Sequence, residues 1–425
     1  MMTVIHRLLA ASALLQPALA AVAECSAPYT DCTEGLQAAL NTCDPRVDVH
    51  PLPALKPWPV LPLLVTCSHQ KIVLHDQTVI EAKRWAYNAS GATLLTLDAV
   101  SNVSIVGYGA TLRMHRADYN NPKWYKCAQG RHGIALRGAR HVSIAGLTVT
   151  ETGGDGIYVS ISYHWPSGVP WSKGITVNDA MLVRNYRQGM SVIAVEGLVV
   201  TNTVLGETGS DGMGHPPMAG IDFEPNDETQ PLSGVRFHNV TARSNAGRGF
   251  QWSLTRNTPK TPPLDILFED CSVVGGGSYG ISFSGSGHGG VPTGGNFQLT
   301  NVHVSLTNGS GLLIENKDGG PTMALKNVTI DRVARQGGAP IWIEGQTKLC
   351  TGASFESVQL LDDVDRVPVN LMGNVTNMRG EIDVFNPALS TEHCTFTHPP
   401  PPGLNISCND LSETQKSQVT ETERV

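Results

Sequence analysis

The sequence lacks any surplus of positive charge. Its 425 residues include 30 Lys and Arg against 37 Asp and Glu, which gives a formal net charge of −7 at pH 7. A chain with this balance has neither the basic surface that holds nucleic acid nor the polybasic segment that holds a membrane surface. No nucleic-acid partner is therefore expected.

Long apolar runs are missing after the first two dozen residues. No later segment is long enough to span a bilayer, and the last residues do not form the apolar tail that a lipid anchor requires. Near the start, His6 and Arg7 precede an apolar run over residues 8–19, and small residues that suit signal peptidase follow it. Residues 1–23 are expected to be a signal peptide, and the mature protein is expected to be secreted, with no membrane partner.

The nine cysteines are unevenly placed along the chain and fit an oxidising compartment. Disulfides are expected to fasten the two ends, because most cysteines lie near one end or the other. The early and late groups are Cys25, Cys32, Cys43, Cys67, Cys127 and then Cys350, Cys394, Cys408. Cys271, inside an apolar segment, is expected to be a free thiol in the core. Spacing leaves the pairing open, since eight cysteines allow 105 connectivities.

Glycine, with 44 residues, marks an internal repeat. Eight segments start with Gly or Pro and continue with alternating apolar residues. They begin at Gly133, Gly156, Gly189, Gly220, Gly249, Gly280, Gly311 and Pro340. From Gly156 onward the intervals are 33, 31, 29, 31, 31 and 29 residues. A second set precedes most of them, at Val103, Val142, Ile175, Val235, Ile266, Phe297 and Met323.

Two or three short strands in each turn of about 30 residues predict an all-β, parallel β-solenoid. Strands must stack in parallel because each repeat returns to the same side, and alternation sends one set of side chains inward. We expect one β-solenoid domain over residues 24–408, with an N-terminal cap over about residues 24–90. Residues 33–42 have helical apolar spacing and are expected to cover the open end. The polar residues 409–425 are expected to be disordered.

Two segments, residues 93–114 and 141–160, resemble the right-handed parallel β-helix proteins of the pectin-lyase-like superfamily. The resemblance covers about residues 94–316 and implies a single-stranded right-handed parallel β-helix. Members include pectate lyases, polygalacturonases and other glycosidases, alginate epimerases and phage tailspikes, so the resemblance implies a carbohydrate-active protein without choosing a reaction. The segment GGDGI is similar to the Asn-Thr-Asp-Gly segment of polygalacturonases, and Asp155 matches its aspartate. Arg187 and Gln188 stand where that pattern has paired aspartates, and the Gly-His-Gly of residues 287–289 lies four coils further on.

The repeat gathers polar residues from distant parts of the chain on one outward face, because equivalent positions in successive coils lie about 4.8 Å apart. Three carboxylates on this face are the predicted catalytic residues: Asp155, Asp222 and Glu224. The predicted substrate-binding residues are His132, Tyr158, Trp165, Arg187, Gln188, Arg248 and Gln251. Insertions at residues 114–129, 162–171 and 206–218 border the same coils, and loops on one face of a rigid scaffold commonly carry binding. A plainer interpretation stays open, in which Asp155 is a turn residue and the arginines only neutralise the acids.

The spacing of the carboxylates favours hydrolysis. The Cα atoms of Asp222 and Glu224 should lie roughly 6.6 Å apart, and Asp155 roughly 10 Å from Asp222 along the axis. An acid and a base that flank a water in inverting glycosidases lie about 6.5–9.5 Å apart. Crowded carboxylates also raise the pKa of one member, which supplies a proton donor. We therefore predict a glycoside hydrolase acting on a polysaccharide, with no cofactor and no metal.

Two alternatives remain open on the sequence. In a uronate lyase or C5-epimerase, Arg187 or Arg248 would help remove the C5 proton, and the acids could bind Ca²⁺. In a non-catalytic protein that binds glycans or builds a surface layer, the three acids could be exchanged for amides without loss. The sequence names neither the sugar nor the oligomeric state.

Overall fold

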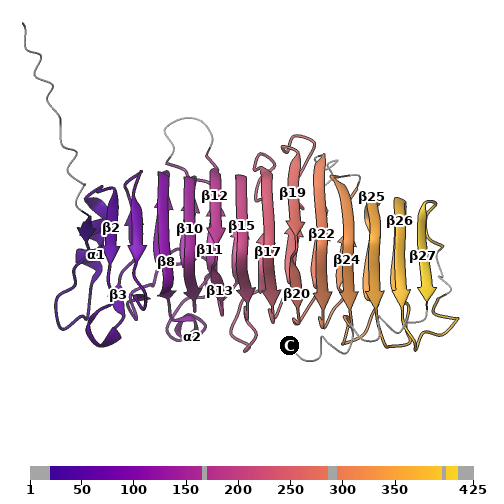
Figure 1. Ribbon diagram of the computed structural model, residues 1–425, viewed down its shortest axis with the longest axis horizontal. Coiled ribbons are helices and arrows are strands. Elements are labelled where there is room, and N and C mark those ends of the chain that lie inside the picture. Colours follow the sequence, from indigo (N-terminus) through magenta and orange to yellow (C-terminus); the bar gives the residue numbers. More distant parts are fainter. Residues whose placement is uncertain (1–19, 165–169, 286–293, 319, 395–398, 410–425) are drawn as a thin grey trace, which may run out of the picture.

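The computed structural model describes residues 20–164, 170–285, 294–318, 320–394 and 399–409. Its strands run side by side along one long axis, with α1 (Thr33–Asn41) at one end and β27 (Leu404–Asn409) at the other (Figure 1). Strands pair in parallel with their counterparts one coil before and one coil after. The predicted right-handed parallel β-helix is confirmed.

The strands fall into recurring positions around each coil. One face of the solenoid is built from β4 (Leu63–Val65), β7 (Leu95–Asp98), β9 (Ile134–Arg137), β11 (Asp155–Ser160), β14 (Gln188–Val192), β16 (Ala219–Phe223), β18 (Phe250–Ser253), β21 (Ile281–Ser284) and β23 (Leu312–Glu315). The other positions hold β1 (Ala21–Val22), β2 (Arg46–Val49), β3 (Trp58–Val60), β5 (Lys71–Leu74), β6 (Val79–Ala82), β8 (Ser101–Arg113), β10 (Arg140–Thr150), β12 (Ser172–Asn178), β13 (Met181–Val183), β15 (Val195–Gly206), β17 (Leu232–Arg243), β19 (Leu264–Glu269), β20 (Ser272–Val274), β22 (Gly295–Ser305) and β24 (Thr322–Asp331). The long strands β25 (Ile341–Leu361) and β26 (Val369–Phe385) run through both. Two short helical segments, η1 (Pro53–Leu55) and α2 (Arg116–Tyr119), lie in loops.

The repeating glycines are required by close approach between coils. A Cβ added to Gly220 would lie 2.7 Å from the carbonyl oxygen of Gly249, and one added to Gly189 would lie 2.6 Å from that of Gly220. Side chains at these positions would force the coils apart. The register that these glycines predict is the one observed, with Ile157, Met190, Ile221 and Phe250 aligned.

Alternation along these strands separates a dry core from a polar outer face. Ile221 and Phe223 point inward and are fully buried, and the Phe223 ring stacks on Trp252 at a centroid distance of 5.3 Å. Asp222 and Glu224 therefore lie on the outer side. Since burial of an aromatic or aliphatic side chain contributes about 1.5–3 kcal/mol, repeated inward residues hold this face rigid.

A helix and disulfides lie at the ends of the solenoid, as predicted, although fewer cysteines form bridges than expected. α1 covers the first end with Leu36, Ala39 and Leu40 buried, and the disulfides Cys25–Cys32 and Cys43–Cys67 join the segments around it. The Cys394–Cys408 disulfide lies at the other end. Cys271 is free and buried, which confirms the prediction for it.

The expectation that all eight other cysteines take part in bridges is wrong. Cys127 is exposed in the loop over residues 114–129 and is free. Cys350 is buried in β25 and lies opposite Val375 of β26, so this neighbouring strand brings no second sulfur to it.

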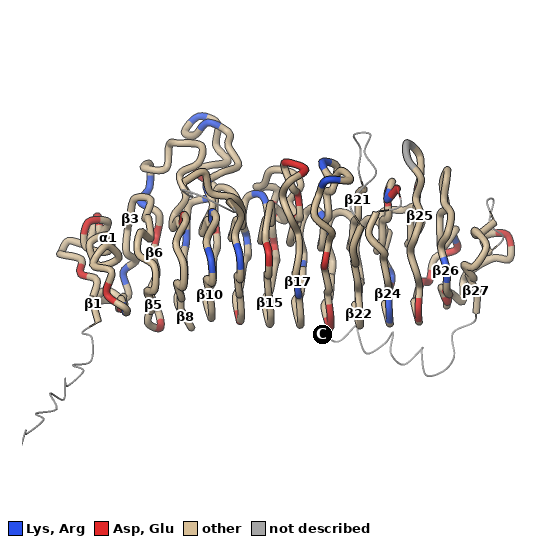
Figure 2. The backbone as a smooth tube through the Cα atoms, turned by 90° about the horizontal axis from the view of Figure 1, so that it is seen from above, with Lys and Arg blue, Asp and Glu red and all other residues tan. Residues whose placement is uncertain are grey.

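Figure 2 shows acidic and basic residues spread along the whole solenoid, without a long stretch of one sign. No helix among the described residues has the length and apolar content to cross a membrane. Residues 1–19 and 410–425, with most of the predicted signal peptide and tail, lie outside the described residues, as do Trp165 and residues 287–289. Those predictions remain predictions.

Candidate active site

The predicted columns of outward side chains are present. Tyr158, Ser191, Asp222 and Gln251 are register partners on β11, β14, β16 and β18. Neighbouring coils therefore place these side chains above one another at about 4.8 Å per step. Residues up to 93 positions apart in the chain share one small region of the surface because the coils stack.

Asp155 is a buried acid whose two carboxylate oxygens both lack a hydrogen-bond partner in the part of the chain that the structure describes. It is the first residue of β11 and is 0% exposed, yet neither carboxylate oxygen has a hydrogen-bond partner among the described residues. The backbone N–H of Asp155 donates to His132 Nδ1 at 3.1 Å. Because Nδ1 accepts this hydrogen bond with its lone pair, it carries no hydrogen to donate to Asp155 Oδ2, 3.2 Å away. Buried polar groups are nearly always paired, so this carboxylate is available for a ligand.

Arg187 joins two of the three predicted catalytic acids. One terminal nitrogen donates to Glu224 Oε2 at 2.8 Å, and the other lies 3.9 Å from Asp155 Oδ1. Contacts to one guanidinium leave at most about 9 Å between these two oxygens, a separation compatible with paired catalytic carboxylates. Although burial lowers it, the charges of Asp155 and Glu224 raise the pKa of Arg187 above its usual value. Arg187 therefore stays protonated.

Asp222, the third predicted catalytic acid, is buried beneath the side chains around it. It is 0% exposed, and Gln188 Nε2 donates to its Oδ2 at 2.8 Å, while Ser191 Oγ donates to Gln188 Oε1 at 2.6 Å. Burial and the nearby charge of Glu224 raise the pKa of Asp222 to about 8. At neutral pH this carboxyl group is mostly protonated, so it does not balance the positive charge of Arg187.

The raised pKa of Asp222 predicts a pH-dependent stability. Between its ordinary pKa of 3.8 and the folded value of about 8, the folded chain holds a proton that the unfolded chain has released. The contribution of this group to the free energy of unfolding is therefore full below about pH 4 and is lost as the pH rises through about 8. We expect Asp222→Asn, whose amide oxygen can still accept from Gln188, to flatten this decline. Urea unfolding of both proteins between about pH 5 and 9 measures it, and parallel curves would contradict the raised pKa.

A cavity of about 250 Å³ opens above the carboxylates. Asp155, Glu224, Arg187 and His132 line it, whereas Asp222 does not. Its lining residues are Gln129, Gly130, His132, Asp155, Tyr158, Arg187, Ile193, Glu224 and Asn226. A second cavity of about 350 Å³ shares His132, Tyr158 and Asn226 and continues toward Arg137 and His164. The two together form one extended polar depression.

The other predicted binding residues occupy different places. Tyr158 stacks on His132 with a centroid distance of 4.4 Å, so both rings line the two cavities. Arg248 does not pair with the acids as expected; it donates to Gln251 Oε1 at 3.3 Å and lies over the Tyr279 ring. Arg248 lies on the coil after that of Asp222, but the residue of this coil that stands opposite Asp222 is Gln251.

Two insertions meet beside the cavity, which residue spacing alone could not predict. Arg116 is fully buried and donates to both oxygens of Asp211 at 2.9 and 2.6 Å, which ties residues 114–129 to residues 206–218. Gln129 Nε2 also lies 3.3 Å from His215 Nε2. The only sequence signal for this contact is that one loop carries a basic residue and another, three coils further on, carries an acidic one.

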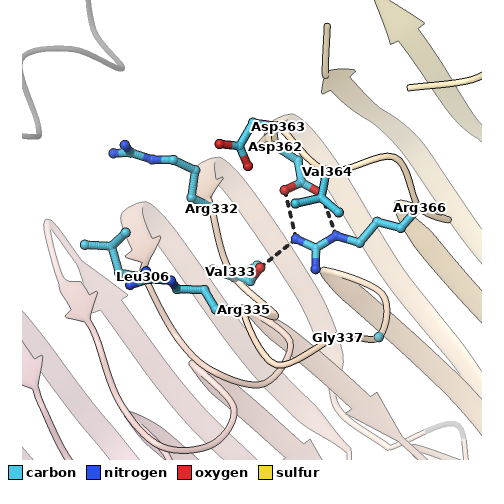
Figure 3. A pocket seen from close by; sticks show the side chains of 10 residues that line it. Leu306, Arg332, Val333, Arg335, Gly337, Asp362, Asp363, Val364 and Arg366 are labelled. Carbon is cyan, nitrogen blue, oxygen red and sulfur yellow. Dashed lines mark hydrogen bonds and ion pairs between the residues drawn. The ribbon is translucent and has the colours of Figure 1, made fainter. Parts of the chain in front are cut away.

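A larger cavity of about 560 Å³ lies elsewhere, between coils near the C-terminal end (Figure 3). Arg366 there donates to both oxygens of Asp362 at 2.8 Å and to the Val333 carbonyl at 2.7 Å. The charges of Arg366 and Asp362 thus neutralise each other within the fold. No pair of acids with unsatisfied oxygens faces this cavity among the described residues, so the smaller cavity is the better candidate for catalysis.

No protein-family model matches the sequence. An uncharacterized SPbeta prophage-derived protein of Bacillus subtilis, YorA, is 26% identical over 162 residues, or 37% of this chain, and the match spans 27% of that protein's length. Solved structures extend the likeness over most of the chain. The family 28 exopolygalacturonase of Yersinia enterocolitica has 13% identity and a TM-score of 0.58 over 92% of this chain and 78% of its own.

Two further solved structures belong to an epimerase and to an adhesin. The A-module of mannuronan C-5 epimerase AlgE6 from Azotobacter vinelandii has 14% identity and a TM-score of 0.56 over 90% of this chain and 96% of its own. The surface protein and adhesin PfbA of Streptococcus pneumoniae has 10% identity and a TM-score of 0.52 over 89% and 94%. Likeness at this level of identity reports the fold and not a reaction. The chain is a right-handed parallel β-helix protein of the pectin-lyase-like fold.

Proposed function

We propose that this protein is a glycoside hydrolase that cleaves a polysaccharide with Asp155 and Glu224. The observation that carries the proposal is the buried, unpaired carboxylate of Asp155 in a cavity that it shares with a second carboxylate. An arginine held between two acids fixes their relative position. Likeness to an exopolygalacturonase supports a reaction on polysaccharides.

The contacts suggest a role for each acid. Glu224, which accepts a hydrogen bond from Arg187 and is partly open to solvent, takes a proton from a water while the water oxygen bonds to the anomeric carbon. Asp155 is proposed as the acid: it takes up a proton from solvent water beforehand and gives it to the departing oxygen as the glycosidic C–O bond breaks. Asp222 is proposed as a positioning residue and not a catalytic one, because it does not line the cavity that Asp155 and Glu224 line.

The geometry argues against arginine as the base of a uronate lyase or epimerase. Such a base must release a proton, whereas the pKa of Arg187 is raised by its two carboxylate neighbours. Arg248 lies away from the acids, against Gln251 and Tyr279. In hydrolysis the carboxyl groups carry the proton transfers, so neither arginine has to lose its proton.

Aromatic rings near the cavity suit a sugar polymer. Trp85 and Trp124 are half-exposed and meet edge to face at 4.9 Å. Gly130, which lines the cavity, packs against Ser90 and Gly91 of the segment that carries Trp85. Flat exposed rings beside a polar depression are a common surface for sugar stacking and hydrogen bonding.

A product screen tests the proposal. Purified protein, incubated with neutral and with uronic polysaccharides, is expected to release new reducing ends without unsaturated products. Unsaturated uronates would show a lyase, a changed uronate composition without cleavage would show an epimerase, and retention on a polysaccharide without any product would show a binding protein. Each of these three outcomes contradicts hydrolysis. The Asp155→Asn variant, purified in parallel, excludes contaminating activity.

Secretion belongs to the same proposal. Three disulfides support folding in an oxidising compartment, and the sequence offers a signal-peptide pattern ahead of them. A secreted hydrolase would meet its polysaccharide outside the cell.

A further inference from the structure

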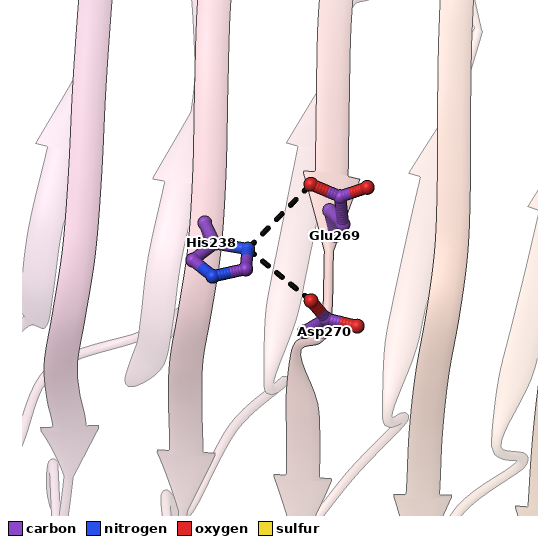
Figure 4. Close-up of side chains that lie close together, drawn as sticks. All are labelled: His238, Glu269 and Asp270. Atoms are coloured by element: carbon purple, nitrogen blue, oxygen red, sulfur yellow. Dashed lines mark ion pairs between the residues drawn. The ribbon is translucent and has the colours of Figure 1, made fainter.

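A histidine and two carboxylates converge on a flank of the solenoid outside the candidate active site. His238 lies on β17, and Glu269 and Asp270 lie on the next coil, at the end of β19 (Figure 4). Glu269 Oε2 and Asp270 Oδ2 are 3.5 and 3.3 Å from the same nitrogen, His238 Nδ1. The three ligand atoms lie within 4.8 Å of one another.

These distances are long for direct hydrogen bonds and right for a shared ion. A charged imidazole that donates to a carboxylate lies about 2.7–2.9 Å from it. A tetrahedral zinc ion at bond lengths of about 2.0–2.2 Å holds its ligand atoms about 3.3–3.6 Å apart. The separations of 3.5 and 3.3 Å from His238 Nδ1 match those between ligand atoms of a zinc ion.

Adjacent residues supply both carboxylates because Asp270 has a φ of 53°. In an extended strand consecutive side chains point to opposite faces, whereas this left-handed residue turns the chain and brings Asp270 beside Glu269. The same corner in other coils is occupied by Asn202, Asn239 and Asn301, with similar positive φ values.

Those asparagines form an amide ladder along the solenoid, made by residues 202, 239, 270, 301 and 327. Each later Nδ2 donates to the oxygen before it: Asn239 to Asn202 at 2.8 Å, Asn301 to Asp270 at 3.0 Å, and Asn327 to Asn301 at 2.8 Å. At Asp270 the series stops, because a carboxylate has no hydrogen to donate to Asn239. Among the described residues, no hydrogen bond joins Asp270 to Asn239. An acid at this position thus forgoes a ladder bond that asparagine would make, and its second oxygen turns to His238.

We propose that His238, Glu269 and Asp270 bind a divalent transition metal of the zinc type. One imidazole nitrogen and two carboxylate oxygens are a ligand set that zinc accepts, and exposure leaves its fourth position to water. Ca²⁺ takes oxygen ligands, so the imidazole selects against it. The ion links two consecutive coils at the place where the amide ladder is interrupted. The site is independent of the proposed hydrolase activity.

Metal titration of the full-length protein tests the site. Chelator-treated protein, freed of chelator, is titrated with Zn²⁺ by calorimetry and then scanned for thermal unfolding with and without Zn²⁺. Wild type is expected to bind one equivalent that Ca²⁺ does not displace, and to unfold at a higher temperature with zinc. His238→Ala and Asp270→Asn should each bind at least tenfold more weakly. His69→Ala, which removes an exposed imidazole beside the amide of Asn102, should bind as wild type does.

Asp270→Asn separates a metal site from a plain ion pair. In the metal site, the metal-free variant should be at least as stable as metal-free wild type, because asparagine rejoins the amide ladder, and zinc should no longer raise its unfolding temperature. Zinc affinity unchanged in this variant, or no binding by wild type beyond that of His238→Ala, would overturn the proposal.

Discussion

Asp155→Asn is expected to lower kcat/KM on the substrate found by the product screen by at least about 1000-fold, a loss of about 4 kcal/mol of transition-state stabilisation. The amide has nearly the shape of the acid but cannot deliver a proton to the departing oxygen. Folding should be preserved, since the carboxylate oxygens of Asp155 make no hydrogen bond that the amide would lose. Steady-state rates and an unfolding curve measured on one preparation check both parts.

The matched control for this prediction lies on the same outer face. Glu315 occupies, three coils further on, the position relative to Gly311 that Glu224 occupies relative to Gly220. Glu224→Gln should abolish turnover as Asp155→Asn does, whereas Glu315→Gln should leave it unchanged. Full activity in Asp155→Asn would remove this residue from the chemistry.

Arg187→Met is expected to destabilise the protein by about 3–5 kcal/mol, as removal of one partner of a buried ion pair usually does. The side chain of Arg187 is 14% exposed, and it is the cation nearest to both Asp155 and Glu224. Without it two acids would face each other beside the covered Asp222. Urea unfolding near pH 7 gives the difference in the free energy of unfolding.

An exposed arginine gives the comparison for this second effect. Arg236 pairs with Asp265 at 2.6 Å, but both side chains are about half-exposed. Arg236→Met should therefore cost at most about 1 kcal/mol. If Arg187→Met cost no more than Arg236→Met, the guanidinium would not be holding the carboxylates together, and the site as described would be wrong.

The fold was predictable because one steric requirement recurs in successive coils from Gly133 to Gly311. A carbonyl oxygen of the next coil leaves no room for a side chain at Gly189 or Gly220, so glycine returns at each turn and reveals the register. From that register the sequence also predicts that Asp155, Arg187 and Glu224 share a face. The contacts of Arg187 confirm that the three meet.

The spacing of residues in the sequence could not predict how deeply each outward side chain is buried. Asp222 and Glu224 are two residues apart on one outward face, yet the first is covered and the second is partly open, because loops and neighbouring side chains decide what water reaches. The tie between Arg116 and Asp211 was hidden for the same reason, since it joins two loops of no regular spacing. Cys127 lies in such an irregular loop, whereas Cys350 lies within β25, and spacing did not show that either cysteine is free.

A double-mutant cycle tests the central claim most directly, because it asks whether Asp155 and Glu224, far apart in the chain, act on one substrate as one site. The values of kcat/KM are measured for wild type, Asp155→Asn, Glu224→Gln and the double variant. Residues that act as a unit are not additive, so the double variant should be about as impaired as the worse single variant. Losses that simply multiply would show two independent effects, and the shared active site would be contradicted.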